Sequence, residues 1–91
     1  MEKIEELESL RRALDDIDRQ LVAIFERRMA LSAQIGAVKG EKGLPVLDEK
    51  RRDAVLRGCV AGLDDPSLTP YVETLYETIL ALSCRRQEEL V

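Results

Sequence analysis

The sequence predicts an all-α fold of three helices, one long and N-terminal and two shorter. All three prolines and three of the five glycines lie in two clusters, at residues 40–45 and 62–70. These helix-breaking clusters divide the chain into segments of about 3–40, 48–62 and 67–90. Within each segment the apolar residues recur at helical steps, and none shows the alternation of a strand. We therefore expect residues 1–91 to form one small all-α domain.

The first predicted helix carries an apolar stripe with the a/d spacing of a coiled coil. The stripe consists of Leu7, Leu10, Leu14, Ile17, Leu21, Ile24, Leu31, Ile35 and Val38. About 36 helical residues span roughly 54 Å, whereas a compact chain of this size has a radius of gyration of only ~12 Å. Because two shorter helices cannot cover such a stripe, we expect an oligomer, most simply a two-fold dimer of long helices.

The second and third predicted helices are also amphipathic. The second has Asp48 at its start, suited to an N-cap, and one face formed by Val55, Leu56, Cys59, Val60 and Leu63. Pro66 suits the entry of the third helix, with Asp64 or Asp65 as its cap. The apolar steps of the third helix are Leu68, Val72, Leu75, Ile79, Leu82 and Leu90.

Composition excludes several classes of function. The chain has no histidine, which excludes Ser-His and Cys-His nucleophiles and most catalytic zinc sites. Cys59 and Cys84 form no CxxC motif, so we expect free thiols in a reducing compartment and neither a metal nor another cofactor. The net charge of −4 disfavours general nucleic-acid binding. With no apolar run of ~20 residues and no signal-like N-terminus, we expect a cytoplasmic protein that does not bind membranes.

Charged residues interrupt the apolar stripes. Arg28 occupies an a position of the first helix, and a buried guanidinium needs an anion, either a ligand or an ion-pair partner across a dimer, unless it snorkels to solvent. Lys39 follows eleven residues later on nearly the same face. Arg11 is too far from Arg28 along one straight helix, but an antiparallel pair of helices brings it towards Arg28 and Lys39 of the other chain. The alternative for Arg11 is a solvated charge.

The other two helices add further polar candidates. Asp48, Arg51 and Arg52 follow one another at the start of the second helix, where Asp48 and Arg52 could also form a simple i,i+4 pair. Ser83 and Gln87 lie four residues apart beside the core stripe of the third helix, where an interhelical hydrogen bond or plain exposure to solvent is the alternative. Together the candidates predict a mostly cationic pocket, suited to a small polyanion rather than to covalent catalysis.

In order and spacing these residues resemble the all-helical AroQ-type chorismate mutases. The resemblance rests on Leu10-Arg11, Ile17-Asp18, Glu26-Arg27-Arg28, Gly36-Ala37-Val38-Lys39, Pro45 to Arg51, and Ser83 to Gln87. It implies an intertwined homodimer whose two sites mix residues of both chains. It also implies an enzyme of phenylalanine and tyrosine biosynthesis that rearranges chorismate to prephenate.

The resemblance also implies residue roles. Arg28 and the partner's Arg11 grip the carboxylates of chorismate, and Arg51 and Ser83 add polar contacts. Lys39 and Gln87 hydrogen-bond the ether oxygen whose bond breaks, which makes Arg28, Lys39 and Gln87 the catalytic candidates. Asp48 lies near the ring hydroxyl.

Arg52 departs from the family pattern, in which a glutamate that accepts the substrate hydroxyl usually follows Arg51. Arginine cannot accept a hydrogen bond. Either Asp48 or a water takes over, or Arg52 has a substrate-binding role of its own. Isochorismate-pyruvate lyases share the fold and lack that glutamate, so they remain an alternative. A dimeric helical interaction module without catalysis is the other, and the domain could stand alone or belong to a bifunctional protein.

Overall fold

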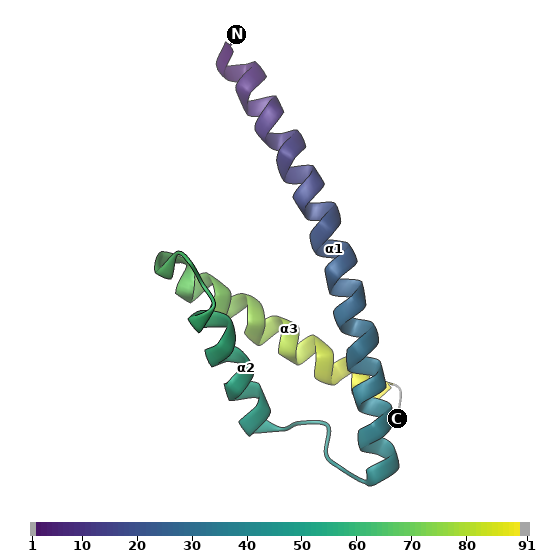
Figure 1. Cartoon of the computed structure of the whole chain (residues 1–91). Helices are drawn as coiled ribbons and strands as arrows, with labels where there is room; N and C mark the ends of the chain where they lie inside the picture. Colours follow the sequence, from purple (N-terminus) through teal and green to yellow (C-terminus); the bar gives the residue numbers. More distant parts are fainter. Residues whose placement is uncertain (1, 90–91) are drawn as a thin grey trace. The chain divides into compact units, whose positions relative to one another are not determined.

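The computed structural model describes residues 2–89, which form three α-helices and one short 3-10 helix (Figure 1). Helix α1 spans Glu2–Lys42, α2 Glu49–Ala61, η1 Pro66–Leu68 and α3 Thr69–Glu89. No strand occurs between residues 2 and 89, so the predicted all-α class with three helices is confirmed. Leu90, which we assigned to the third helix, lies outside the described residues.

Local sequence explains where the helices begin and end. Helix α1 ends at Lys42, and the next residue, Gly43, has a φ of 67°, a left-handed conformation that glycine adopts without strain. Asp48 is the N-cap of α2, as predicted, because its Oδ1 accepts a hydrogen bond of 3.0 Å from the N–H of Arg51. Asp65 caps η1 by accepting from the N–H and the hydroxyl of Ser67 at 3.0 and 2.6 Å.

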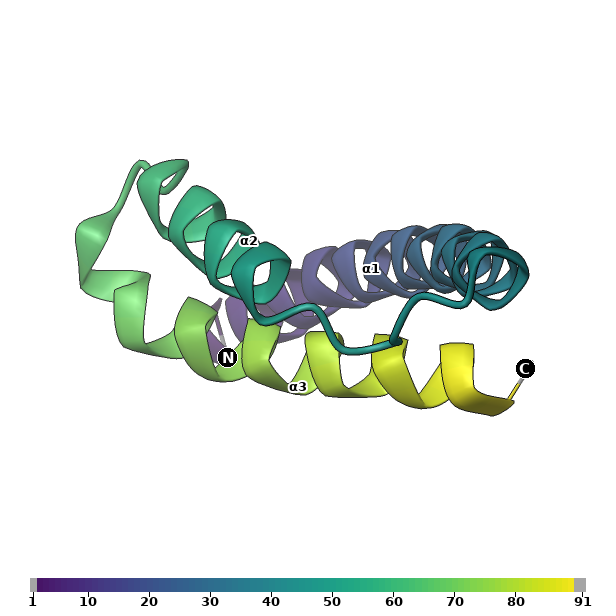
Figure 2. The ribbon, with the colours of Figure 1, turned by 90° about the horizontal axis from the view of Figure 1, so that it is seen from below.

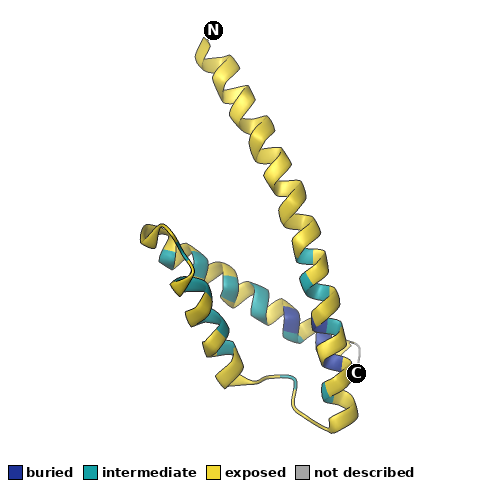
Figure 3. Ribbon diagram, in the orientation of Figure 1, coloured by how far each residue is buried: buried dark blue, intermediate teal, exposed yellow. Residues whose placement is uncertain are grey.

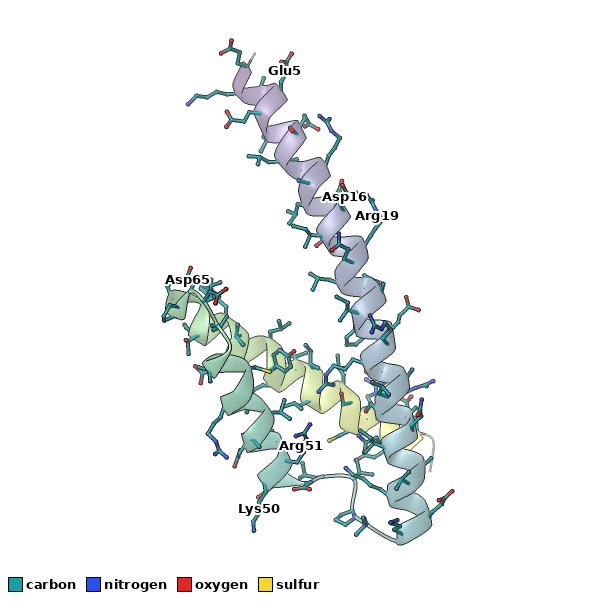
Figure 4. All side chains as sticks on the ribbon, viewed as in Figure 1. Glu5, Asp16, Arg19, Lys50, Arg51 and Asp65 are labelled. Atoms are coloured by element: carbon teal, nitrogen blue, oxygen red, sulfur yellow. The ribbon has the colours of Figure 1, made fainter. Side chains whose placement is uncertain are left out.

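The chain divides into two units, residues 2–30 and residues 31–89, which we describe separately. The first unit is the N-terminal part of α1. Nearly all of its side chains are exposed, and only Phe25, Arg28 and Met29 are half-buried (Figure 3). Local ion pairs join residues three positions apart in this unit, such as the pair between Asp16 and Arg19 (Figure 4).

The second unit contains the end of α1 together with α2, η1 and α3. Helices α2 and α3 pack against each other (Figure 2). The half-buried apolar side chains of these two helices are Val55, Leu56, Cys59, Val60, Val72, Tyr76, Ile79, Leu80 and Cys84. Both cysteines are free thiols. The C-terminal part of α3 meets the last turns of α1, where Ser32, Gly36, Ser83 and Gln87 are buried.

The described chain buries polar side chains and leaves its apolar ones accessible. Among residues 2–89 no hydrophobic side chain is buried, and the buried polar ones are Ser32, Ser83 and Gln87. The predicted stripe of α1 stays exposed at every position, for example 56% at Leu14 and 57% at Leu21. The apolar positions Leu75 and Leu82 of α3 are exposed as well. This apolar surface is far more continuous than the scattered residues a monomer usually exposes.

None of the helices within residues 2–89 combines the length and the apolarity needed to cross a membrane.

Candidate functional site

The buried residues of the second unit form a polar junction between α1 and α3. Ser32, Gly36 and Lys39 lie on one face of α1 at positions i, i+4 and i+7. A Cβ at position 36 would lie 2.9 Å from Cγ and 3.1 Å from Cα of Gln87. Carbon atoms in contact normally stay about 3.5–4.0 Å apart. Only glycine at position 36 therefore lets α3 approach α1 this closely.

Ser32 links the two helices through its hydroxyl. The hydroxyl donates to the main-chain oxygen of Ser83 at 3.1 Å, and it accepts from Nε2 of Gln87, also at 3.1 Å. Within residues 2–89, no buried side-chain nitrogen or oxygen lacks a hydrogen-bond partner. The junction is thus a satisfied polar network, which is the condition for burying such groups without a large penalty.

Lys39 extends the network towards the loop that follows α1. Its Nζ donates to the main-chain oxygen of Val46 at 2.6 Å and to Oε1 of Gln87 at 3.2 Å. The side chain is half-buried. An ammonium has three N–H donors, and these two bonds leave one of them for another acceptor. Lys39 therefore presents a positive charge, held at two points, with a remaining donor.

The start of α2 holds three of the predicted site residues. Asp48 contacts the main chain of Arg51 as a helix cap and forms no ion pair with Arg52 in this structure, so that alternative is wrong here. Arg51 is exposed, and it points to a different side of α2 from its neighbour Lys50 (Figure 4). Arg52 is half-buried and lies 3.9 Å from Oδ1 of Asp53.

Arg52 also lines an open hollow at the start of α2. The other residues of this hollow are Leu47, Glu49 and Asp53. The carboxylates of Glu49 and Asp53 thus line the same hollow as Arg52 and partly balance its positive charge. Arg52 shares this hollow with Leu47 of the preceding loop as well.

Arg11 and Arg28 belong to the first unit. Arg11 forms an ion pair of 3.2 Å with Glu8, and its side chain is 62% exposed. Such exposed pairs contribute only about 0–1 kcal/mol, so Glu8 does not hold Arg11 firmly. Arg28, at the a position of the apolar stripe, is half-buried.

The structure thus joins Lys39, Ser83 and Gln87 in one junction and places Asp48, Arg51 and Arg52 together at the start of α2. The hydrogen bond from Nε2 of Gln87 to Ser32 confirms the interhelical alternative for Gln87, whereas the bond from Ser32 to Ser83 reaches the main-chain oxygen of Ser83. Sequence reasoning missed Ser32 as a member of the junction. The row of small residues Ser32 and Gly36 before Lys39 was the available signal, because small side chains permit a close helix crossing.

The chemistry of these side chains limits what the site can do. Lys39 meets the neutral groups of Ser32 and Gln87 at the junction, while Arg51 and Arg52 lie near carboxylates at the start of α2. Within residues 2–89 no three potential metal-ligating His, Cys, Asp or Glu side chains come together. The arrangement suits the binding of an anion and the stabilisation of charge that develops on an oxygen atom.

Comparison with known proteins identifies relatives of this chain. The T-protein of Haemophilus influenzae (strain ATCC 51907 / DSM 11121 / KW20 / Rd) is 39% identical over 57 residues, which is 63% of this chain and 15% of that protein. The T-protein of Enterobacter agglomerans is 34% identical over 53 residues, 58% of this chain and 14% of that protein. The chain therefore spans only about a seventh of the length of these curated relatives. No solved structure matches it significantly.

The family comparison covers most of the chain. The family model described as chorismate mutase type II matches residues 10–88, a range that includes every predicted site residue from Arg11 to Gln87. This match confirms the resemblance drawn from the sequence motifs and favours the enzyme over the non-catalytic helical module. The chain belongs to the chorismate mutase type II family, a family of isomerases.

Proposed function

We propose that this chain rearranges chorismate to prephenate in aromatic amino acid biosynthesis. The observation that carries the proposal is the Lys39 ammonium, fixed by Val46 and Gln87 with one N–H remaining, in a chain whose family match spans residues 10–88. The reaction is an isomerisation in which the ether C–O bond breaks while a new C–C bond forms. It needs neither a nucleophile nor a proton transfer, and the residues at this site supply neither.

Lys39 supplies the main electrostatic contribution. Negative charge grows on the ether oxygen as its bond to carbon breaks, and a donor already aimed at that oxygen stabilises the transition state more than the ground state. Holding Nζ at two points removes the need to reorganise the side chain during the reaction. Gln87 carries a second Nε2 hydrogen beyond the one that Ser32 accepts, and we assign it to the same oxygen.

The arginines select the substrate conformer. We assign the carboxylates of chorismate to Arg28, Arg51 and the Arg11 of a second chain, with Ser83 as an additional polar contact. Two carboxylates held at separate cations keep the reacting carbons close together. Binding in this conformer lowers the entropic part of the activation barrier. Asp48 and Arg52 contact the remaining polar groups of the substrate, including the ring hydroxyl.

A second copy of the chain completes the site in this proposal. The stripe of α1 is exposed at every position, and no hydrophobic side chain between residues 2 and 89 is buried. A helix of this kind is only marginally stable without packing. We propose an intertwined homodimer that buries this stripe and brings Arg11 of one chain to the Arg28 and Lys39 of the other. The cytoplasmic location stays a prediction.

The direct test is turnover of chorismate by the purified chain, followed by identification of the product. Prephenate supports the proposal. Salicylate and pyruvate from isochorismate would instead indicate the lyase, and no turnover of either compound refutes an enzymatic role. Lys39→Ala and Arg28→Ala are each expected to lower kcat/KM by about 10²–10³-fold, the usual loss for one such donor, while the dimer persists. Near-normal kcat/KM in either variant would contradict the assignment.

Mixing two inactive variants tests whether Arg11 acts in the partner's site. A heterodimer of Arg11→Ala and Lys39→Ala chains has one site with both defects and one with neither. Random exchange of two-fold dimers in equal amounts therefore restores about one quarter of the wild-type sites. If Arg11 instead acts in the site of its own chain, each site has one defect and mixing restores nothing. Light scattering on the separate variants checks that both remain dimers.

A further inference from the structure

We infer that Ser32 is a positioning residue that sets the orientation of the Gln87 amide and, through it, of the Lys39 ammonium. The inference rests on the proposed function for its catalytic consequence, while the orientation itself follows from the hydrogen bonds around Ser32. The three side chains form one chain of contacts from the Ser83 main chain through Ser32 and Gln87 to Lys39.

The direction of each hydrogen bond in this series is determined by the donors available. A serine hydroxyl has one proton, and that of Ser32 goes to the main-chain oxygen of Ser83, 3.1 Å away. Towards Gln87 the hydroxyl can therefore only accept, so it requires the NH₂ end of the amide. An ammonium can only donate, so Lys39 requires the oxygen end. Both neighbours of Gln87 thus favour the same one of its two orientations.

The flipped amide is unfavourable at both ends. It would place the NH₂ group against the Lys39 ammonium, where two donors face each other. It would also turn the amide oxygen to Ser32, whose proton would have to leave the buried Ser83 oxygen. Without the Ser32 hydroxyl, one of these two constraints disappears. The amide then loses its anchor on α1, and Oε1 no longer holds the Lys39 nitrogen in one place.

Burial makes this role effective. Ser32 is 4% exposed, Ser83 6% and Gln87 6%, so water cannot easily replace a missing partner. Gly36 lies between Ser32 and Lys39, and there the Cα, Cβ and Cγ of Gln87 run so close to α1 that a Cβ at position 36 would lie within 3.1 Å of all three. The orientation of Gln87 therefore depends mainly on its two polar neighbours.

The test combines kinetics with a direct observation of the amide. Ser32→Ala is expected to lower kcat by about tenfold, the effect of losing one well-placed hydrogen bond, with KM changed less than about twofold. In a Gln87→Ala background the same substitution should have no further effect on kcat, because Ser32 acts through Gln87. Thr78→Ala is the matched control, since it deletes an exposed α3 hydroxyl that bonds only to its own helix at Thr74.

The amide observation does not depend on turnover. The side-chain NH₂ signals of Gln87 in nitrogen-15 NMR spectra should show slow hydrogen exchange in the wild type, fast exchange in Ser32→Ala and slow exchange in Thr78→Ala. Unchanged exchange in Ser32→Ala overturns the positioning role even in an active enzyme. An equal loss of kcat in the wild-type and Gln87→Ala backgrounds also overturns it, because it indicates a purely structural effect. Absence of chorismate turnover in the wild type refutes the proposed function, while the exchange result still decides the orientation.

Discussion

Replacing Gly36 by alanine tests whether the close approach of α3 to α1 positions the site. The new Cβ would meet Cγ, Cβ and Cα of Gln87 at 2.9, 3.0 and 3.1 Å. Normal carbon contacts of about 3.5–4.0 Å require a separation of roughly 0.5–1 Å. Because one of the three atoms belongs to the α3 backbone, a rotation of the Gln87 side chain cannot relieve the overlap.

The expected magnitudes follow from two opposing contributions. Overpacking costs about 1–3 kcal/mol, and alanine in a helix recovers about 0.5–1 kcal/mol relative to glycine. We expect Gly36→Ala to lower the free energy of unfolding by about 0.5–2 kcal/mol. Displacing Gln87 lengthens its 3.2 Å contact with Lys39, and a misplacement of about 1 Å typically lowers the rate about 10²-fold. We therefore expect kcat/KM to fall by about 10–100-fold.

Gly40→Ala provides the matched control on the same helix. A Cβ at position 40 meets nothing within 4 Å, so the substitution should add about 0.5–1 kcal/mol of stability and leave activity nearly unchanged. Denaturant unfolding gives the stability, and loss of chorismate absorbance gives the activity. If Gly36→Ala is as active as the wild type and at least as stable, the inference that this contact positions Gln87 is wrong.

Three further predictions concern other parts of the molecule. Arg52→Glu should raise mutase turnover if the site only lacks an acceptor for the substrate hydroxyl, and a fall in kcat/KM would show that Arg52 itself binds substrate. Leu14→Asp, at a position 56% exposed in the single chain, should dissociate the proposed dimer in light scattering, whereas an unchanged mass would exclude the stripe as the interface. The hydrogen bonds from the hydroxyl and the N–H of Ser67 lower the pKa of Asp65 from its ordinary 3.8. Their stabilisation is present above that ordinary value and is lost as pH falls through the lowered one, so Asp65→Asn should flatten the acid unfolding curve in this range.

Local signals in the sequence were sufficient for much of the fold. The clusters of glycine and proline predicted three helices, and the capping role of Asp48 followed from its place before an apolar periodic segment. The choice between Asp64 and Asp65 as the second cap needed the structure, which selects Asp65. That choice depends on the turn geometry around Ser67, and both residues satisfy the same sequence pattern.

The candidate site was only partly accessible to the same reasoning. Lys39 and Gln87 could be proposed because they interrupt or flank apolar stripes, and the structure joins them at 3.2 Å. Ser32 does not interrupt an apolar stripe, and the small residues Ser32 and Gly36 before Lys39 are only a weak signal, because a serine on a helix is ordinary in any exposed position. Its role depends on a residue 55 positions later in the chain, and single-helix periodicity contains no information about such a contact.

The sequence by itself determined the helical class, the Asp48 cap, the apolar stripe of α1 and the cationic character of the candidate residues, because these depend on neighbours within one or two turns. Only the tertiary structure decided that Ser32, rather than solvent, accepts the hydrogen bond from Nε2 of Gln87. It also decided that Val46 and Gln87 both accept hydrogen bonds from Lys39. The physical reason is that hydrogen-bond direction in a buried network depends on which donors and acceptors meet, and here they come from separate helices that meet at Gly36.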